Sequence, residues 1–229
     1  MKKYLAVSGI PLPALEKEFE TVILPPDAAL AEPVQRHADM ILTVYDGRIF
    51  VHSSYYEMNT TVIDIIADFG GLDVCLTDDL RGAEYPLDVS LNTLDAGGKL
   101  LCRRDTVSTH LKNYPIINTN QGYAGCTALY AAGTVITADP STIRACRNVR
   151  MPYYEISGSD ICLHGYDTGF IGGACGVCGN TIYIYGDPTC SQSGRELDNF
   201  CRTMGLSLIS LNDGPVTDIG GIKFIEKSR

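Results

Sequence analysis

The sequence predicts an α/β protein, a five-bladed α/β-propeller of ββαβ repeats with pseudo-five-fold symmetry. Three observations predict it. A pattern of strand, turn, strand, helix and strand recurs along the 229 residues, four times without interruption and a fifth time divided between the two ends. Two adjoining strands precede each helix, whereas simple parallel winding has one. Such a unit cannot bury its own apolar face, so the units are expected to pack against one another.

The first two copies show the pattern with glycine-containing hairpin turns, which are typical of two-strand connections. The first is interpreted as strands over 38–44 and 49–51, a helix over 62–69 and a strand over 72–76. The second is interpreted as strands over 87–91 and 100–102, a short helix over 107–111 and a strand over 116–117.

The third and fourth copies carry the clearest helix signals. The third has strands over 126–130 and 134–137, a helix over 142–149 that Ser141 is expected to cap, and a strand over 153–156. The fourth has strands over 169–171, 181–185 and 207–211, with a helix before the last. In that helix one apolar stripe follows the spacing i, i+3, i+4, i+7: Leu197, Phe200, Cys201 and Met204.

The fifth copy is divided between the termini. Strands over 216–219 and 222–225 end the chain, and a strand over 4–7, a helix over 12–19 and a strand over 21–24 begin it. Joining the ends completes one unit and leaves no unpaired edge, which favours a closed ring. We therefore expect a single domain over 1–229, closed between the N- and C-terminal strands, with the fifth blade shared between about 1–30 and 214–229. The alternative is an ordinary sheet of alternating strands and helices.

Bulk composition restricts the classes of function. Net charge is −9 and no Lys/Arg cluster is present, which disfavours a nucleic-acid partner. No segment approaches the roughly 18 apolar residues of a membrane span. The odd number of cysteines, nine, and the absence of a convincing signal peptide favour a reducing cytoplasm. The run over 169–176 lacks the ending of a phosphate loop, so no cofactor is expected. Oligomeric state leaves no sequence signal.

The first strand of each copy would lie innermost in such a ring, so that polar residues far apart in sequence meet near its axis. The polar residues selected in this way are His37, Asp39, Asp88, Asn92, Cys126, Asp167, Thr168 and Asp218. A buried ring of carboxyls requires a cation or protonation. A guanidinium suits paired carboxylates, because it offers planar donors. The alternative is that these acids cap turns in solvent.

The order of these residues resembles the pentein fold of guanidine-modifying enzymes: arginine and agmatine deiminases, dimethylarginine hydrolases and amidinotransferases. Several of them carry His-x-Asp with the catalytic Cys two blades later, as in His37-Ala38-Asp39 and Cys126 here, although the placement is shifted as in a circular permutation. The resemblance implies that Cys126 is the nucleophile, His37 the general acid/base and Asp39 a guanidinium ligand. Asp218, Asp88 and Asn92 are further candidates for substrate binding.

The chain resembles more closely an uncharacterised family found largely in Firmicutes, over nearly its whole length. The runs that carry this resemblance are Gln121 to Cys126, Gly165-Tyr166, 169–173 and 218–221. That family is thought to share the fold, and it has no assigned reaction. It usually has His-Pro-Asp where this chain has His37-Ala38-Asp39.

Two functions from different classes are left open. The first is Cys-dependent hydrolysis or group transfer on a small cationic guanidine or amidine compound. The second is a non-catalytic pentein that binds a protein or ribosomal partner through its surface, as the ribosome anti-association factors of this fold do. Cys126 is alternatively a buried structural thiol. The lone Cys175-x-x-Cys178 pair is a weak zinc signal without a second pair, so no metal is assigned.

Overall fold

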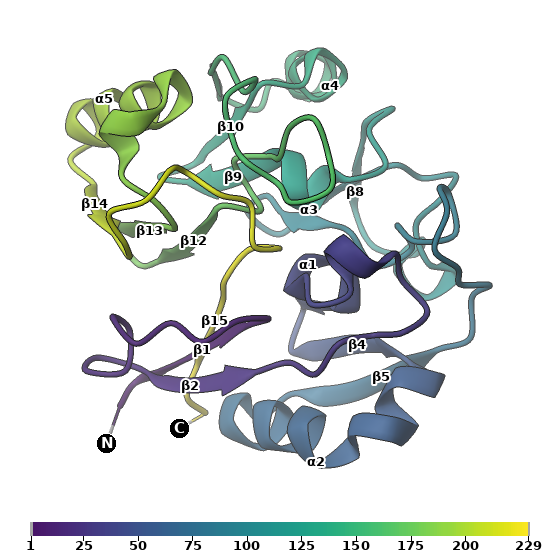
Figure 1. The fold of residues 1–229 in the computed structure, drawn as a ribbon. Helices are drawn as coiled ribbons and strands as arrows, with labels where there is room; N and C mark the ends of the chain where they lie inside the picture. Colours follow the sequence, from purple (N-terminus) through teal and green to yellow (C-terminus); the bar gives the residue numbers. More distant parts are fainter. Residues whose placement is uncertain (1, 229) are drawn as a thin grey trace.

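Five small three-stranded sheets make up the computed structural model, which describes residues 2–228 (Figure 1). In each sheet the central strand pairs antiparallel with one neighbour and parallel with the other. This is the pairing that a ββαβ unit produces, because a hairpin gives antiparallel strands and a crossover gives parallel ones. The chain is therefore a mixed α/β protein built from five similar sheets.

Four of the sheets are continuous in sequence. They comprise β3 (Leu42–Tyr45), β4 (Arg48–His52) and β5 (Asp73–Thr77); β6 (Leu94–Asp95), β7 (Leu100–Cys102) and β8 (Ile116–Asn118); β9 (Ala128–Ala131), β10 (Thr134–Thr137) and β11 (Tyr153–Glu155); and β12 (Cys175–Cys178), β13 (Thr181–Ile184) and β14 (Ser207–Ser210). Between β3 and β4, Asp46 and Gly47 both have positive φ, at 51° and 70°, as a tight hairpin turn requires.

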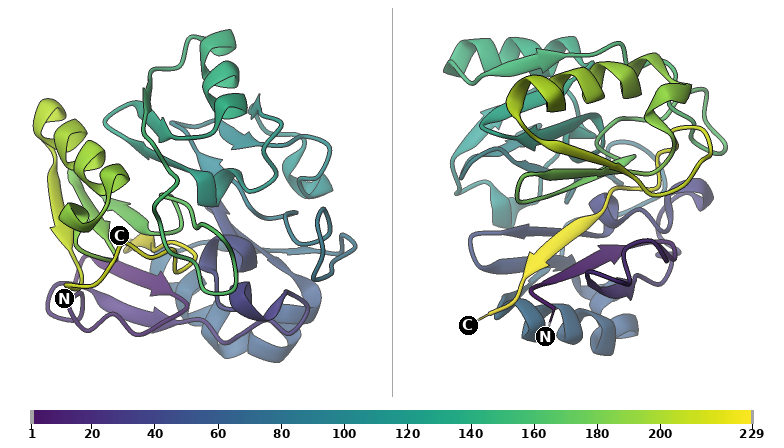
Figure 2. Two further views of the ribbon diagram at one scale, coloured as in Figure 1. Left: turned by 45° about the horizontal axis from the view of Figure 1, so that its top comes forward. Right: turned by 90° about the vertical axis from the view of Figure 1, so that its left-hand side faces the viewer.

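The fifth sheet joins the two ends of the chain. β15 (Lys223–Glu226) pairs antiparallel with β1 (Tyr4–Ser8), which pairs in parallel with β2 (Glu20–Ile23). Figure 1 shows the yellow C-terminal strand beside the purple N-terminal one, and both views of Figure 2 agree. The two ends of the chain therefore contribute strands to one sheet.

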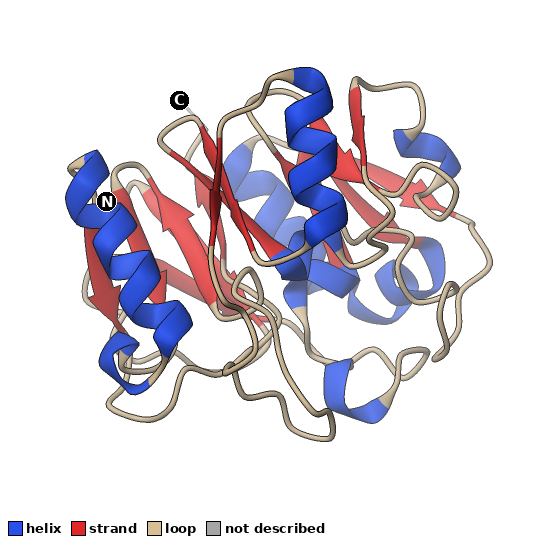
Figure 3. Cartoon of the chain, turned by 90° about the horizontal axis from the view of Figure 1, so that it is seen from above, coloured by secondary structure: helices blue, strands red, loops and turns tan. Residues whose placement is uncertain are grey.

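Three helices cover these sheets: α2 (Ser53–Gly70), α4 (Pro140–Val149) and α5 (Gln192–Met204) (Figure 3). In α5 the predicted stripe buries Leu197, Phe200 and Cys201, but Met204 in the last turn is 42 % exposed. The cap of α4 is Asp139 and not Ser141, because the Asp139 carboxylate accepts the N–H of Thr142 at 2.7 Å. None of the helices in residues 2–228 is long and apolar enough to cross a bilayer.

Several predicted elements are wrong in detail. Residues 38–41 and 124–127 are single helical turns, α1 (Ala38–Ile41) and α3 (Ala124–Thr127), and the strands begin only after them. Residues 87–91 and 169–171 are not strands, and the strand of the fourth unit instead contains Cys175–Cys178. Residues 12–19 form successive turns, and 107–111 contains only a 3₁₀ turn, η2 (Thr109–Leu111). Two further 3₁₀ turns are η1 (Glu32–Val34) and η3 (Pro188–Cys190).

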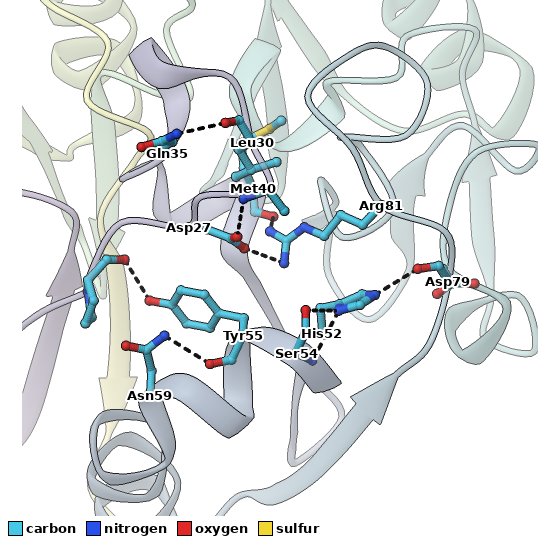
Figure 4. Close-up of polar contacts among 12 residues, drawn as sticks. Asp27, Leu30, Gln35, Met40, His52, Ser54, Tyr55, Asn59, Asp79 and Arg81 are labelled. Atoms are coloured by element: carbon cyan, nitrogen blue, oxygen red, sulfur yellow. Dashed lines mark hydrogen bonds and ion pairs between the residues drawn. The ribbon is translucent and has the colours of Figure 1, made fainter.

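A buried ion pair fixes the position of α1 (Figure 4). Arg81 Nη1 lies 2.5 Å from Asp27 Oδ2, and both side chains are almost fully buried. The second nitrogen of the same guanidinium donates to the Met40 carbonyl oxygen at 3.3 Å. Tyr55 of α2 donates from its hydroxyl to the Pro25 carbonyl at 2.8 Å. The segment before α1 is therefore held from the loop after β5 and from α2.

A cavity of about 390 Å³ is lined by residues from β3, β6, β9, β12 and β15, the first strand of each sheet. We call it the axial cavity. Beside this cavity, glycine lets two backbone segments approach each other closely. A Cβ on Gly172 would lie 2.5 Å from the carbonyl oxygens of Gly125, Cys126 and Ala128.

We predict that the C-terminal strand belongs to the cooperative core. Ile225 of β15 is 5 % exposed and packs in the cluster that contains α2 and β3. Ile225→Ala should therefore cost roughly 2–4 kcal/mol of unfolding free energy, measured by urea denaturation. The neighbouring exposed Glu226→Ala is the control. Equal effects of the two substitutions would show that the C-terminal strand unfolds separately.

Candidate functional site

Cys126 lies in α3, immediately before β9, and is 4 % exposed. It lines a cavity of about 150 Å³, which we call the thiol cavity. His37, Asp88 and Asp218 line the same cavity. The structure therefore brings together four of the six predicted site residues, from three different units of the fold and the segment that precedes β15.

Asn92 lies behind the thiol and holds it in place. Its Oδ1 accepts the backbone N–H groups of Gly125 at 2.7 Å and Cys126 at 3.3 Å. Its Nδ2 lies 3.0 Å from Cys126 Sγ and donates to the Asp39 carbonyl at 3.1 Å. Because both ends of the amide are engaged with protein, this geometry fits a residue that positions Cys126 and Asp39.

Asp39 is the most deeply buried acid of the site, at 1 % exposed. Burial raises the pKa of the Cys126 thiol, and the charge of the Asp39 carboxyl adds to that effect. Within residues 2–228, neither carboxyl oxygen has a partner at good hydrogen-bond geometry. Asp39 lines the axial cavity, while Cys126 lines the thiol cavity. The pair thus lies between the two cavities.

Asp218 and His37 face each other across the thiol cavity. Asp218 Oδ1 lies 3.7 Å from His37 Nδ1, beyond hydrogen-bond distance. The Asp218 carboxylate accepts the N–H groups of Gly220 and Phe170, both at 2.9 Å. Gly173 leaves room for it, since a Cβ there would lie 1.9 Å from Asp218 Oδ1. Backbone donors therefore fix the direction of this carboxyl.

Asp88 and an aromatic wall complete the cavity. The Tyr123 hydroxyl donates to Asp88 Oδ2 at 2.8 Å, and its ring stacks with that of Phe170 at a centroid distance of 6.5 Å. Tyr166 also lines the cavity. The sequence did not identify these three aromatic residues as site residues, although all three lie in the runs that carry the family resemblance.

Burial controls the protonation states of the site. It raises the pKa of Asp39, and it raises that of Asp218 to about 7, with the Asp39 charge adding to the effect. Burial also lowers the pKa of His37, which the Asp39 charge partly opposes. The pKa of Cys126 is raised well above 9, first by burial and then by the two carboxyls. Among these residues, the carboxyls of Asp39 and Asp218 lie beside a neutral thiol and a neutral imidazole, so no positive charge balances them.

The remaining candidates lie elsewhere. Cys175 is buried and lines the axial cavity, and Cys178 is half-buried in the same strand, so both cysteines of the pair lie in β12. Thr168 lines the thiol cavity, whereas Asp167 lines a separate surface cavity. Residues 2–228 contain no cluster of three or more His, Cys, Asp or Glu side chains with metal-binding geometry.

The buried acid Asp218 predicts a pH dependence of stability. Its pKa is about 7 in the folded chain against 3.8 as the ordinary value. Between these values the folded state holds more protons than the unfolded state, so this residue lowers the unfolding free energy as pH rises. Asp218→Asn should therefore gain in melting temperature relative to wild type as pH is raised from about 5 to 8. Thermal melts across that range measure the difference.

The exposed Asp213→Asn serves as the control for this measurement. Its difference from wild type should stay constant with pH. An Asp218→Asn profile that runs parallel to wild type would contradict the assignment of a raised pKa to this carboxyl.

Known structures share this fold at low sequence identity. The DDAH of Pseudomonas aeruginosa, a cysteine-to-serine mutant complexed with citrulline, is similar with a TM-score of 0.57 and 9 % identity, covering 99 % of this chain and 100 % of that one. The agmatine deiminase of C. jejuni gives 0.54 and 9 %, over 93 % and 78 %. SxtG, an amidinotransferase from Microseira wollei in the saxitoxin biosynthetic pathway, gives 0.55 and 9 %, over 100 % and 95 %.

These likenesses identify the fold, which is that of the penteins named above. The curated proteins include no match to the chain. The family described as "Family of unknown function (DUF6873)" matches residues 13–223, nearly the whole sequence. The separate expectation of a family found largely in Firmicutes is not tested by this match. The chain belongs to the DUF6873 family, and its fold is shared with guanidine-modifying enzymes.

Proposed function

We propose that this protein is a cysteine-dependent enzyme that hydrolyses a guanidine or amidine compound or transfers a group from it. One observation carries the proposal: Asp39 and Asp218 are buried beside Cys126, and no Lys or Arg side chain of residues 2–228 pairs with either at ion-pair distance. A buried carboxyl without a counter-charge is costly. A cationic ligand with several N–H donors removes that cost.

A single ring underlies this proposal. The five sheets would close into a propeller, one domain with the first strand of each sheet facing the axis. The axial cavity, lined by all five of these strands, supports the closure. In such a ring the thiol cavity lies at one end of the axis, where residues of distant segments converge.

The reaction follows from the positions of the groups. The Cys126 thiol gives its proton to the neutral His37 imidazole, and the resulting thiolate attacks the guanidinium carbon and forms a tetrahedral adduct. The bond from that carbon to one nitrogen then breaks, and His37 supplies the proton that the departing amine needs. Water or an acceptor amine next attacks the thiol-bound carbon, while His37 removes its proton, and the carbon–sulfur bond breaks to return the thiolate. Asp218, which lines the thiol cavity, holds the remaining N–H groups throughout, while Asp39 adds a negative charge from the boundary between the two cavities.

The bound cation also activates the nucleophile. A positive charge beside the sulfur lowers the pKa of a thiol. The high pKa of Cys126 is therefore a property of the site without a ligand. Binding of the guanidinium lowers that pKa, because its positive charge opposes the charges of the two carboxyls. Asn92 adds to this effect, because its hydrogen bond already favours the thiolate.

The cavities fit a guanidinium with a substituent. The thiol cavity, about 150 Å³, has room for the planar group itself. An adjoining cavity of about 420 Å³ shares His37, Leu163 and Asp218 with it and gives space for the rest of the molecule. The similar structures add support, since their names describe a deiminase, an amidinotransferase and a DDAH complexed with citrulline.

We also propose a cytoplasmic location. All nine cysteines are free thiols, and Cys162 and Cys190 are exposed. A reducing compartment keeps exposed thiols in this state.

Labelling with 2-chloroacetamidine tests the proposed chemistry. This cationic electrophile should modify Cys126 selectively, because Asp39 and Asp218 draw an amidinium toward that sulfur. Peptide mass spectrometry locates the label. Cys126→Ser should abolish it, and a competing alkylguanidine should slow it. Cys175→Ser, which removes an equally buried thiol beside the axial cavity, is the matched control and should leave labelling of Cys126 unchanged.

Two outcomes would contradict the proposed enzymatic function. Labelling spread over the exposed cysteines with Cys126 spared would show that the site does not attract amidinium compounds. Labelling of Cys126 without release of a ureido, ammonia or amidine-transfer product from any guanidine compound would leave the surface-binding pentein as the better interpretation.

A further inference from the structure

The inference concerns the axial cavity, in which no step of the proposed reaction takes place. It measures about 390 Å³ and shares no lining residue with the thiol cavity. That volume lies within the range of about 300–1,000 Å³ that is typical of sites for small organic ligands. Among the described residues its wall has three charged side chains: the exposed Asp95 of β6, the half-buried Lys223 of β15 and the buried Asp39. Two acids and one base leave one negative charge in excess.

Asp39 is the charged group of this wall that lacks a partner. It is 1 % exposed, and within residues 2–228 neither of its carboxyl oxygens accepts a hydrogen bond or lies at ion-pair distance from a basic group. Its backbone is fixed on both sides, since its N–H donates to the Gly220 carbonyl at 2.9 Å and its carbonyl accepts from Asn92 at 3.1 Å. The carboxyl is therefore held in the wall as a buried acceptor without a donor, which is costly.

Two carbonyl oxygens lie beside this carboxyl. Gly221 has a φ of 75° and lacks a Cβ, which leaves a small space beside it. The position that a Cβ would take lies 3.7 Å from Asp39 Oδ2, and 3.3 Å and 3.7 Å from the carbonyl oxygens of Gly172 and Cys175. All four residues line the axial cavity. Each of the two carbonyls accepts one backbone N–H, from Cys175 at 3.3 Å and from Ile222 at 3.0 Å, and keeps a second lone pair. Three acceptors thus surround one space.

We propose that the axial cavity is a second binding site, for a small primary amine whose ammonium group donates to Asp39 and whose hydrocarbon part lies along the strands. An ammonium group carries three N–H donors and one positive charge, which match three acceptors and one excess negative charge. Burial raises the pKa of Asp39, which favours its protonated form without a ligand. The ammonium group takes the place of that proton, which leaves to solvent, and stabilises the carboxylate.

The rest of the wall fits a hydrocarbon chain. Apolar residues from the first strands of all five sheets line the cavity: Val44, Leu94, Leu129, Val177 and Phe224. A bare inorganic cation would leave most of this volume unfilled, whereas a short alkyl chain gains free energy by leaving water. A guanidinium suits the acceptors around Gly221 less well, because its donors lie in one plane.

Calorimetric titration with n-butylammonium chloride at about pH 7.5 tests the site. Wild type should bind this cation. Butan-1-ol, its uncharged analogue, should bind at least about tenfold more weakly, because the charge-assisted hydrogen bonds are lost. Ammonium chloride, which has no hydrocarbon part, should also bind at least about tenfold more weakly. Absence of butylammonium binding, or equal affinity for butylammonium and either analogue, would overturn the proposal.

Two substitutions locate the bound amine. Asp39→Asn should weaken butylammonium binding at least about tenfold, because it removes the negative charge. Val44→Phe, which narrows the cavity and keeps Asp39, should weaken binding by a comparable factor and does not depend on Asp39→Asn folding. Val74→Phe is the matched control: Val74 is half-buried in the same sheet, is not among the lining residues, and should leave the affinity unchanged. Undiminished binding in Asp39→Asn or Val44→Phe, or an equal loss in Val74→Phe, would contradict the site.

Asp218→Asn separates this site from the thiol cavity. Asp218 lines the thiol cavity and not the axial one, so its substitution should leave the affinity for butylammonium unchanged while it weakens the binding of methylguanidine. A parallel loss for both compounds would place the amine in the thiol cavity and overturn the inference. Butylammonium binding by a protein that neither binds methylguanidine nor becomes labelled at Cys126 would uphold the inference and remove the proposed function.

Discussion

Desolvation of carboxyl groups is the constraint on which the rest of this structure depends. Asp39 and Asp218 are both removed from water beside a thiol, and burial is the largest cause of their raised pKa values. A site of this kind carries unfavourable energy until a cation enters it or its carboxyls take up protons. The protein holds these acids in place by other means. Backbone N–H groups hold Asp218, and Asn92 fixes the backbone carbonyl of Asp39 and the thiol beside it.

The scaffold explains how so costly an arrangement persists. The first strands of all five sheets line one cavity, and glycines such as Gly172 and Gly173 allow the backbones to approach each other. β15 pairs with the N-terminal strand β1. This pairing fixes the position of Lys223 in β15 and of the preceding segment, which carries Asp218. The ion pair of Arg81 with Asp27 anchors α1, which carries Asp39. Many local interactions thus stabilise one centre of buried carboxyls.

Much of the fold could be predicted from sequence because alternation of strands, glycine turns and helices is a local signal. The single turns α1 and α3 were missed because residues 38–43 and 124–129 are all buried, so that they show no helical periodicity. The turns at 12–19 were missed because their apolar spacing imitates a helix. Residues of the candidate site were selected by their expected nearness to the axis, and four of them line one cavity. Which cavity Asp39 faces is set by the helical turn α1, and no sequence pattern specifies that turn. The contribution of Tyr123 likewise depends on contacts between distant units.

We propose that the empty site binds a cation. Calorimetric titration of the Cys126→Ser protein with methylguanidine, and with its neutral isostere methylurea, tests this claim most directly, since no bond can form to the absent sulfur. Methylguanidine should bind with an affinity that rises with pH up to about 7, because below that value binding must release the proton of Asp218, and methylurea should bind far more weakly. Equal affinity for the two compounds, or affinity for methylguanidine that does not change with pH, would contradict it.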